Sequence, residues 1–292
     1  MESNIRIGID LGGTKIECLV LENGIETFRH RIPTQSEQGA DHIISQIHHI
    51  YKQAVNHIDN KNHLIGICTP GSICDETQQL RNSNTTCLNG LALKEMIENK
   101  IDHYISIEND ANCFALAEAQ YGSAKDFDFV FGVIVGTGCG GGIVNNKQIR
   151  IGPNKIAGEW GHSILHSNGY NCYCGKNGCV EKYISGSGLE GILSKNNIRK
   201  TTQDFFLNFN KSKTEQQIYN QFILDFGQAL ANVINTLDPD VIVIGGGLSN
   251  ISHLYTDGIQ AVKQFVFSDS LKTPIIQNTL GDSAGVLGAA LL

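Results

Sequence analysis

The chain has 292 residues, of which 41% are apolar and 17% charged, with a formal net charge of −7. This length and composition suit a globular protein with one large or two ordinary domains. They give no basic patch for nucleic acid or an anionic membrane, no transmembrane run and no signal-peptide pattern. Nine cysteines, mostly single within apolar runs, indicate a reduced, cytoplasmic protein rather than a disulfide framework.

Residues 5–24 predict a β-hairpin centred on the glycine turn DLGGTK, with a closing turn at Asn23-Gly24. Since strand follows strand across the glycines, neither a Rossmann fingerprint nor a Walker loop fits. Glycines let main-chain N–H groups approach phosphate oxygens closely. The candidate nucleotide ligands are Asp10, which would hold Mg²⁺ through water, and Gly12, Gly13, Thr14 and Lys15.

Residues 105–109 predict a short strand that leads into a helix, with Asp110 as the helix N-cap. Capping alone would account for an aspartate at this position. A strand-end carboxylate beside Asn109 could instead orient a hydroxyl of a bound polyol, and the helix dipole favours its ionised form. In phosphoryl transfer such a base mainly positions the hydroxyl. Asp110 is therefore the candidate catalytic base.

Residues 129–147 predict a second hairpin with the same pattern, in which GTGCGGG separates two apolar runs. Gly136 occupies the place that Gly12 has in the first hairpin. The repetition predicts a duplicated fold whose halves face each other across a cleft. One glycine turn alone would be an ordinary hairpin, but the pair together with Asp10 favours a nucleotide site that includes Gly136, Thr137 and Gly138.

The segment CYCGKNGCVE crowds three thiols, and GEWGH just upstream adds an imidazole. Three thiolates and one imidazole form the ligand set of a closed structural zinc site. The alternative is three buried or oxidisable thiols beside a surface histidine. Glu159 and Glu181 flank the site and could accept sugar hydroxyl protons, or could be solvated or paired carboxylates. The candidate zinc ligands are His162, Cys172, Cys174 and Cys179.

Residues 219–250 predict an amphipathic helix, a buried strand VIVI and a third glycine turn. This order opens space for a flat ring beside a sheet, so Gly245, Gly246 and Gly247 are candidate nucleotide contacts. Residues 281–292 predict an apolar helix that packs back onto the first half of the chain.

From end to end the sequence resembles the ROK family (repressors, open reading frames and kinases) of sugar kinases, and within it the fructokinase-like hexokinases. The resemblance implies an α/β, two-lobed actin-like or ribonuclease-H-like (ASKHA) fold with the active site in the interlobe cleft. The expected lobes are residues 1–112 plus 281–292, and residues 113–280 with the zinc-binding loop. The motifs that carry it are DLGGTK (10–15), TPGSI (69–73), NDANCFALAEA (109–119), GTGCGGG (136–142), GEWGH (158–162), CYCGKNGCVEKYISG (172–186) and DPDVIVIGGGLSN (238–250).

The resemblance also implies roles. Asp110 would be the general base for the 6-hydroxyl of a hexose, ATP and Mg²⁺ would be required, and zinc would fix the sugar-binding loop. The family is commonly dimeric, which implies a homodimer. Cys87 stands where fructokinase-like members often have tryptophan, which alters one wall of the sugar pocket. The implied sugar contacts are Gly71, Asn84, Asn109, Asp110, Glu159, His162 and Glu181.

Fructose is the first expected substrate, followed by mannose and glucose, because Trp160 matches the fructokinase-like form of GEWGH. N-acetylglucosamine and N-acetylmannosamine are the alternatives. The family also contains repressors, but the first strand begins too early for a preceding DNA-binding module, and the acidic balance opposes DNA binding. A non-catalytic sugar sensor is the remaining alternative, which the presence of Asp110 and DLGGTK disfavours.

Overall fold

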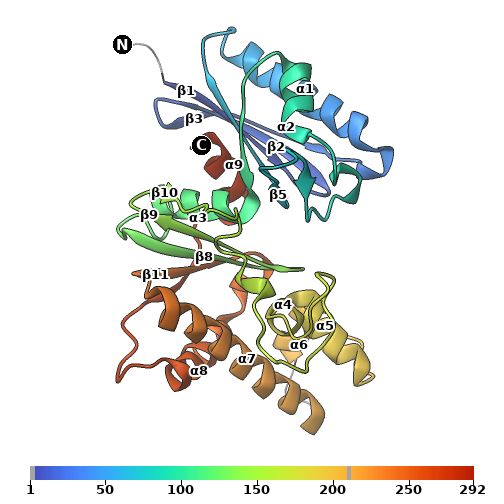
Figure 1. Ribbon diagram of the computed structural model, residues 1–292. Coiled ribbons are helices and arrows are strands. Elements are labelled where there is room, and N and C mark those ends of the chain that lie inside the picture. The colour runs from blue at the N-terminus through green and yellow to red at the C-terminus, as the bar shows by residue number, and fades with distance from the viewer. Residues whose placement is uncertain (1–3, 209–211) are drawn as a thin grey trace. The chain divides into compact units, whose positions relative to one another are not determined.

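Each of the two glycine-centred hairpins belongs to its own five-stranded sheet, and the two sheets lie in different units of the chain. The computed structural model describes residues 4–208 and 212–292 (Figure 1). The chain changes unit after Ala117 and after Gly281, whereas the sequence predicts changes after residues 112 and 280. Unit 1 comprises Met1–Ala117, Ile151–Lys155 and Asp282–Leu292, and unit 2 comprises Glu118–Arg150 and Ile156–Gly281.

The strands of unit 1 are β1 (Ile5–Leu11), β2 (Lys15–Glu22), β3 (Ile25–Pro33), β4 (Leu64–Thr69) and β7 (Ser106–Asn109), with a separate pair β5 (Ser72–Ile73) and β6 (Leu80–Arg81). The sheet order is β3-β2-β1-β4-β7. The first three strands are antiparallel neighbours, and β4 and β7 join parallel to β1. The predicted turn at Asn23-Gly24 is confirmed, with φ angles of 54° and 80°.

Helices cover both faces of the unit-1 sheet (Figure 1): α1 (Ala40–His57) and α2 (Leu93–Ile101) on one, and α9 (Ala284–Ala290) on the other. Ile7 and Ile9 of β1 enter the core beneath α1, because alternate strand residues share a face. Gly8 between them faces α9, where a Cβ would lie 2.2 Å from the carbonyl oxygen of Val286. Residues 284–290 therefore form the predicted closing helix, and the glycine lets its backbone reach the sheet.

The strands of unit 2 are β8 (Phe129–Val135), β9 (Cys139–Asn145), β10 (Gln148–Ile149), β11 (Val241–Gly245) and β12 (Ile275–Gln277). Their order is β10-β9-β8-β11-β12, with β8 to β10 antiparallel and with β11 and β12 parallel to β8. This is the arrangement of the unit-1 sheet repeated. The duplication predicted from the paired hairpins is confirmed.

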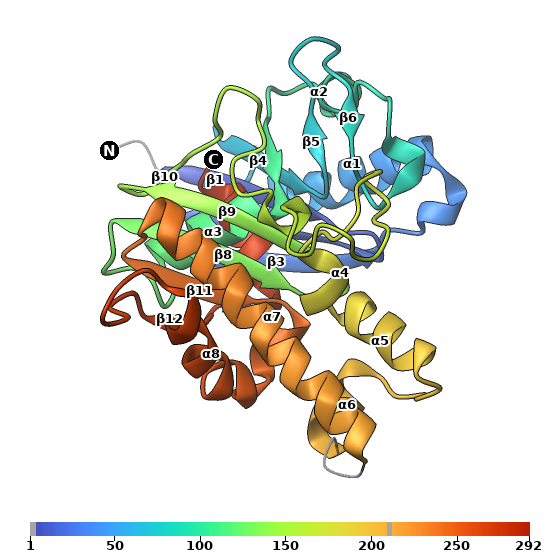
Figure 2. The same cartoon turned by 60° about the horizontal axis from the view of Figure 1, so that its bottom comes forward.

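The helices of unit 2 are α4 (Glu181–Ile184), α5 (Gly186–Lys195), α6 (Thr202–Asn208), α7 (Lys213–Leu237) and α8 (Asp257–Phe265). Helices α7 and α8 lie side by side against the sheet (Figure 2), and Phe222, Phe226 and Ala229 form the buried face that the sequence predicts. None of the helices that the structure describes combines the length and apolarity needed to span a bilayer.

Candidate active site and metal centre

The carboxyl ends of three neighbouring parallel strands carry the candidate residues of unit 1. Asp10 lies near the end of β1, the TPG turn follows β4, and Asn109 ends β7. Because β1, β4 and β7 are parallel and adjacent, these ends meet at one edge of the sheet. Ligands of open α/β sheets bind at such an edge. The structure therefore brings the predicted unit-1 residues together.

Asp10 is held by a thiol that no sequence motif indicates. Cys68, its register partner on β4, donates from Sγ to Asp10 Oδ1 at 3.1 Å. Burial raises the pKa of Cys68 well above its usual value, so the thiol keeps the proton that it donates. Burial also raises the pKa of Asp10, against the lowering effect of this hydrogen bond. The carboxylate is thus poorly solvated and favours a nearby cation.

Asp10→Asn is expected to stabilise the magnesium-free chain at neutral pH. The folded-state pKa of Asp10 lies above the ordinary value of 3.8, so the folded chain retains a proton that the unfolded chain has lost. The cost of ionising Asp10 appears as the pH rises above that value and is absent below it. The difference in melting temperature between variant and wild type should therefore grow as the pH rises from about 4 to about 8, because this range lies above the reference pKa of Asp.

The control for this comparison is Asp102→Asn, because Asp102 is an exposed carboxylate of the same unit in a left-handed position that asparagine tolerates. Thermal unfolding of both variants in magnesium-free buffer measures the effect. A difference for Asp10→Asn that stays constant across this pH range would contradict the burial argument.

The predicted N-cap is wrong by one residue. Helix α3 (Asp110–Gln120) begins at Asp110, and Asn109 caps it: Asn109 Oδ1 accepts from the N–H groups of Ala111 at 2.9 Å and Asn112 at 3.4 Å. Asn109 Nδ2 donates to the carbonyl of Gly71 at 3.0 Å, which joins the TPG turn to the start of α3. Asn109 is a more effective cap than Asp110 because its side-chain oxygen reaches the second and third N–H groups of α3. Asn109 therefore acts as the N-cap of α3.

The loop 81–90 lies beside the first glycine turn within unit 1. A Cβ on Gly13 would lie 3.9 Å from Asn84 Oδ1 and 3.7 Å from Thr85 Oγ1. Thr85 Oγ1 is buried and lacks a hydrogen-bond partner among the described residues. The Cys87 thiol donates to the carbonyl of Ser36 at 3.7 Å. Asn84 and Thr85 therefore line the turn, and Cys87 points at the neighbouring backbone.

Two glycine turns of unit 2 also meet at one sheet edge, because β8 and β11 are parallel neighbours. A Cβ on Gly136 would lie 3.7 Å from the main-chain nitrogen of Gly247. Gly246 has φ +82°, and a Cβ there would lie 2.5 Å from the carbonyl oxygen of Val135, so only glycine fits. The structure thus places the second and third predicted glycine clusters side by side.

The N–H group of the first glycine in each hairpin turn forms a hydrogen bond within that turn. Gly12 donates to the carbonyl of Lys15, and Gly136 donates to the carbonyl of Gly138, each at 3.0 Å. These two N–H groups close their turns and are not directed outward. Phosphate contacts would therefore come from the other donors of the turns, such as the N–H groups of Gly13 and Thr137.

Glu181 is directed at the second hairpin turn. Its Oε2 accepts from the N–H of Cys139 at 3.0 Å and would lie 2.8 Å from a Cβ on Gly138. Glu159, by contrast, is exposed. Trp160 is buried: its indole Nε1 donates to the carbonyl of Gly140 at 2.9 Å, and its ring packs edge-on against Phe131. Trp160 is therefore a packing residue of unit 2.

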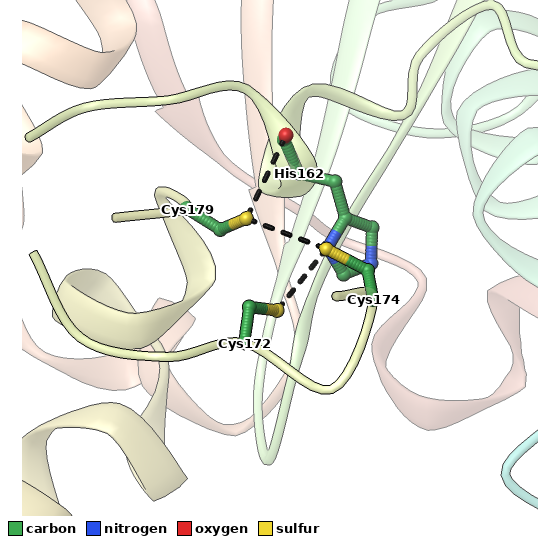
Figure 3. A group of neighbouring side chains, drawn as sticks. All are labelled: His162, Cys172, Cys174 and Cys179. Carbon is green, nitrogen blue, oxygen red and sulfur yellow. Dashed lines mark hydrogen bonds between the residues drawn. The ribbon is translucent and has the colours of Figure 1, made fainter. Parts of the chain in front are cut away.

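The four predicted zinc ligands converge (Figure 3). All their donor atoms lie within 4.8 Å of one another. Cys172 Sγ is 3.6 Å from His162 Nδ1, and Cys174 Sγ is 3.6 Å from Cys179 Sγ. Ligands around a tetrahedral zinc ion are about 3.5–3.8 Å apart, given zinc–sulfur and zinc–nitrogen bonds of about 2.3 and 2.0 Å. The donor set and its spacing fit zinc.

A bound divalent cation would change the protonation of this cluster. Burial, together with the hydrogen bonds to Cys174 and Cys172, raises the pKa of Cys179 to about 12. The Cys179 thiol therefore resists ionisation when no cation is bound. A divalent ion reverses this preference, because it deprotonates the thiols that coordinate it.

Comparisons with known proteins agree with this architecture. The sequence profile of the ROK family matches residues 6–292. The N-acetyl-D-glucosamine kinase of Yersinia enterocolitica is 33% identical over 298 residues, or 98% of each chain. The N-acetylgalactosamine kinase of a Shewanella species is 30% identical over 298 residues, which cover 98% of this chain and 95% of the relative. The crystal structure of a ROK hexokinase from Thermus thermophilus matches with a TM-score of 0.88 at 28% identity, covering 98% of this chain and 97% of the other.

Two units with the same strand order, matched over nearly the whole chain by the Thermus hexokinase, define the two-lobed actin-like (ASKHA) fold class. The chain belongs to the ROK family. Membership of this family and the named relatives support sugar-kinase activity, with a sugar and ATP as the substrates. Cys68, Thr85 and Tyr173 carry no sequence signal, and only the spatial arrangement places them beside candidate site residues.

Proposed function

We propose that this chain transfers the γ-phosphoryl group of ATP to the 6-hydroxyl of an N-acetylhexosamine, with N-acetylglucosamine as the first choice. The observation that carries the proposal is the similarity to N-acetyl-D-glucosamine kinases over 98% of the chain. N-acetylgalactosamine is the second candidate, since a kinase of that sugar is also 30% identical. The relatives do not support fructose, and the alternative substrate of the sequence analysis fits better.

The position of Trp160 gives no support to fructose as the substrate. The indole lies in the core of unit 2 and its only N–H group donates to the backbone of Gly140. Its size therefore serves packing against Phe131. A residue in this position can be shared by kinases of different sugars.

Asp110 is the proposed general base. It sits at the first position of α3, where the helix dipole favours the carboxylate, and its Oδ1 accepts the N–H of Ala111 at 2.9 Å. This hydrogen bond fixes the orientation of the side chain. In phosphoryl transfer the base orients the attacking hydroxyl and accepts its proton late, so a fixed, ionised carboxylate suits the task.

The other proposed contacts follow from the two sheet edges. In unit 1, Gly71, Asn84 and Asn109 would hold the sugar and Asp10 would hold Mg²⁺ through water; Mg²⁺ neutralises charge that develops on the phosphoryl oxygens. In unit 2, Glu159, His162 and Glu181 would bind sugar hydroxyls, and zinc would fix the loop that carries them. Gly12 and Gly136, whose N–H groups close their turns, would let the backbone approach the phosphates closely. The other proposed phosphate and nucleotide contacts are Gly13, Thr14, Lys15, Thr137, Gly138, Gly245, Gly246 and Gly247.

ADP formation by the purified chain with Mg-ATP tests the proposal. The panel contains N-acetylglucosamine, N-acetylgalactosamine, N-acetylmannosamine, glucose, mannose and fructose. We expect the highest kcat/KM with N-acetylglucosamine. Missing hydrogen bonds at a polar subsite reduce kcat/KM by about 10⁴-fold or more, so hexoses without the acetamido group should be far poorer. A preference for fructose would overturn the substrate, and no turnover with any sugar would favour a sensor.

A further inference from the structure

The two ring nitrogens of His162 face different partners. Nδ1 points into the thiol cluster, 3.6 Å from Cys172 Sγ. Nε2 points outward and lies 3.0 Å from the hydroxyl oxygen of Tyr173, and the two rings meet edge to face at 5.2 Å. Tyr173 itself is 75% exposed and follows Cys172 directly in the chain. An exposed aromatic ring is thus held with its hydroxyl against one proposed zinc ligand.

This arrangement determines which nitrogen of His162 carries the proton. A neutral imidazole has one N–H donor and one nitrogen lone pair, and a metal ion binds the lone pair. If Nδ1 faces the metal, the proton is on Nε2, which then donates to the Tyr173 oxygen. Such a partner fixes the tautomer and orientation of the ring and makes the coordinating nitrogen more basic.

The position of Tyr173 makes the effect reciprocal. Cys172 and Cys174 flank it, and both thiols belong to the cluster. A bound ion that draws these two thiols together also fixes the backbone of Tyr173, and with it the hydroxyl that holds His162. Ligand binding and the hydrogen bond therefore stabilise the same loop conformation.

We propose that Tyr173 is a positioning residue for zinc: its hydroxyl accepts the Nε2 proton of His162 and thereby tightens zinc binding. This inference rests on the proposed zinc site but not on the identity of the sugar. The Nε2 proton that Tyr173 accepts is the one that the proposed function directs at a sugar hydroxyl, so a sugar that binds His162 would replace this hydrogen bond. Tyr173 acts through His162 and makes no proposed contact with the reacting atoms.

Tyr173→Phe tests the proposal because it removes one oxygen from an exposed side chain and leaves the ring in place. We expect the zinc dissociation constant, measured by competition with a chromogenic chelator, to rise by about 10- to 100-fold, as for other outer partners of metal ligands. Activity should fall when zinc is limiting and return toward the wild-type level when zinc is saturating. Tyr121→Phe, at another partly exposed tyrosine of unit 2, is the control and should change neither value.

An unchanged zinc affinity would overturn the proposal. So would a higher sugar KM at saturating zinc with no change in zinc affinity, because Tyr173 would then act on the sugar directly. A wild-type chain that binds no zinc would overturn it as well. Zinc affinity is measured without sugar or ATP, so a chain that is inactive on N-acetylglucosamine but shows the expected loss of affinity would sink the proposed function and leave this inference standing.

Discussion

Asp110→Asn is expected to lower kcat by about 10²- to 10⁴-fold, the usual contribution of a positioned general base. The amide keeps the size of the side chain, and its oxygen can still accept the N–H of Ala111. It cannot accept the proton of the 6-hydroxyl. Helix α3 remains capped by Asn109, so the fold around the site should persist. Steady-state ADP formation measures kcat, and calorimetric titration with N-acetylglucosamine measures binding.

Sugar affinity is the control that separates chemistry from folding in this experiment. Asp102→Asn, which changes an exposed carboxylate at the end of α2, should behave like the wild type in both measurements. An unchanged kcat for Asp110→Asn would remove Asp110 from the role of base. A loss of sugar affinity as large as the loss of kcat/KM would make it a binding residue instead.

Cys179→Ala is expected to abolish zinc retention and most of the activity. Cys179 is fully buried and its Sγ is 3.6 Å from Cys174 Sγ, so no other side chain can readily take its place. A structural zinc site needs all four ligands, because metal binding supplies the folding free energy of its loop. Zinc affinity should therefore fall by more than the roughly 100-fold expected at most for an outer partner such as Tyr173.

Metal analysis of the freshly purified protein and kcat/KM for N-acetylglucosamine are the two measurements for this variant. Cys74→Ala is the matched control, because it also removes one thiol but lies outside the cluster, in unit 1. It should retain zinc and activity. Stoichiometric zinc in Cys179→Ala would show that the cluster does not bind the metal as proposed.

Features that repeat along the sequence were predictable. The paired hairpins were visible because alternating apolar residues and glycine turns recur at Gly12 and Gly136, and the structure repeats the strand order around them. The proposed zinc ligands were visible because three of the four lie within eight positions. Local pattern also located the buried face of α7, although the helix begins earlier, at Lys213, where Ser212 caps it.

Features that depend on neighbouring strands were not predictable. Asp10 and Cys68 are 58 positions apart in the chain, and only the parallel pairing of β1 with β4 brings them into contact. The choice between Asn109 and Asp110 as the cap depends on which side-chain oxygen reaches the helix N–H groups. Trp160 could be read as a substrate marker until its indole was found to bond to Gly140.

Phosphorus NMR of the product formed from ATP and N-acetylglucosamine tests the central claim most directly. The account predicts one sugar monoester, phosphorylated on the 6-hydroxyl, formed in equal amount to ADP. It also predicts no product from 6-deoxy-N-acetylglucosamine, which lacks the acceptor. A monoester at another hydroxyl would contradict the proposed reaction, and so would ADP that appears with inorganic phosphate in place of a sugar phosphate.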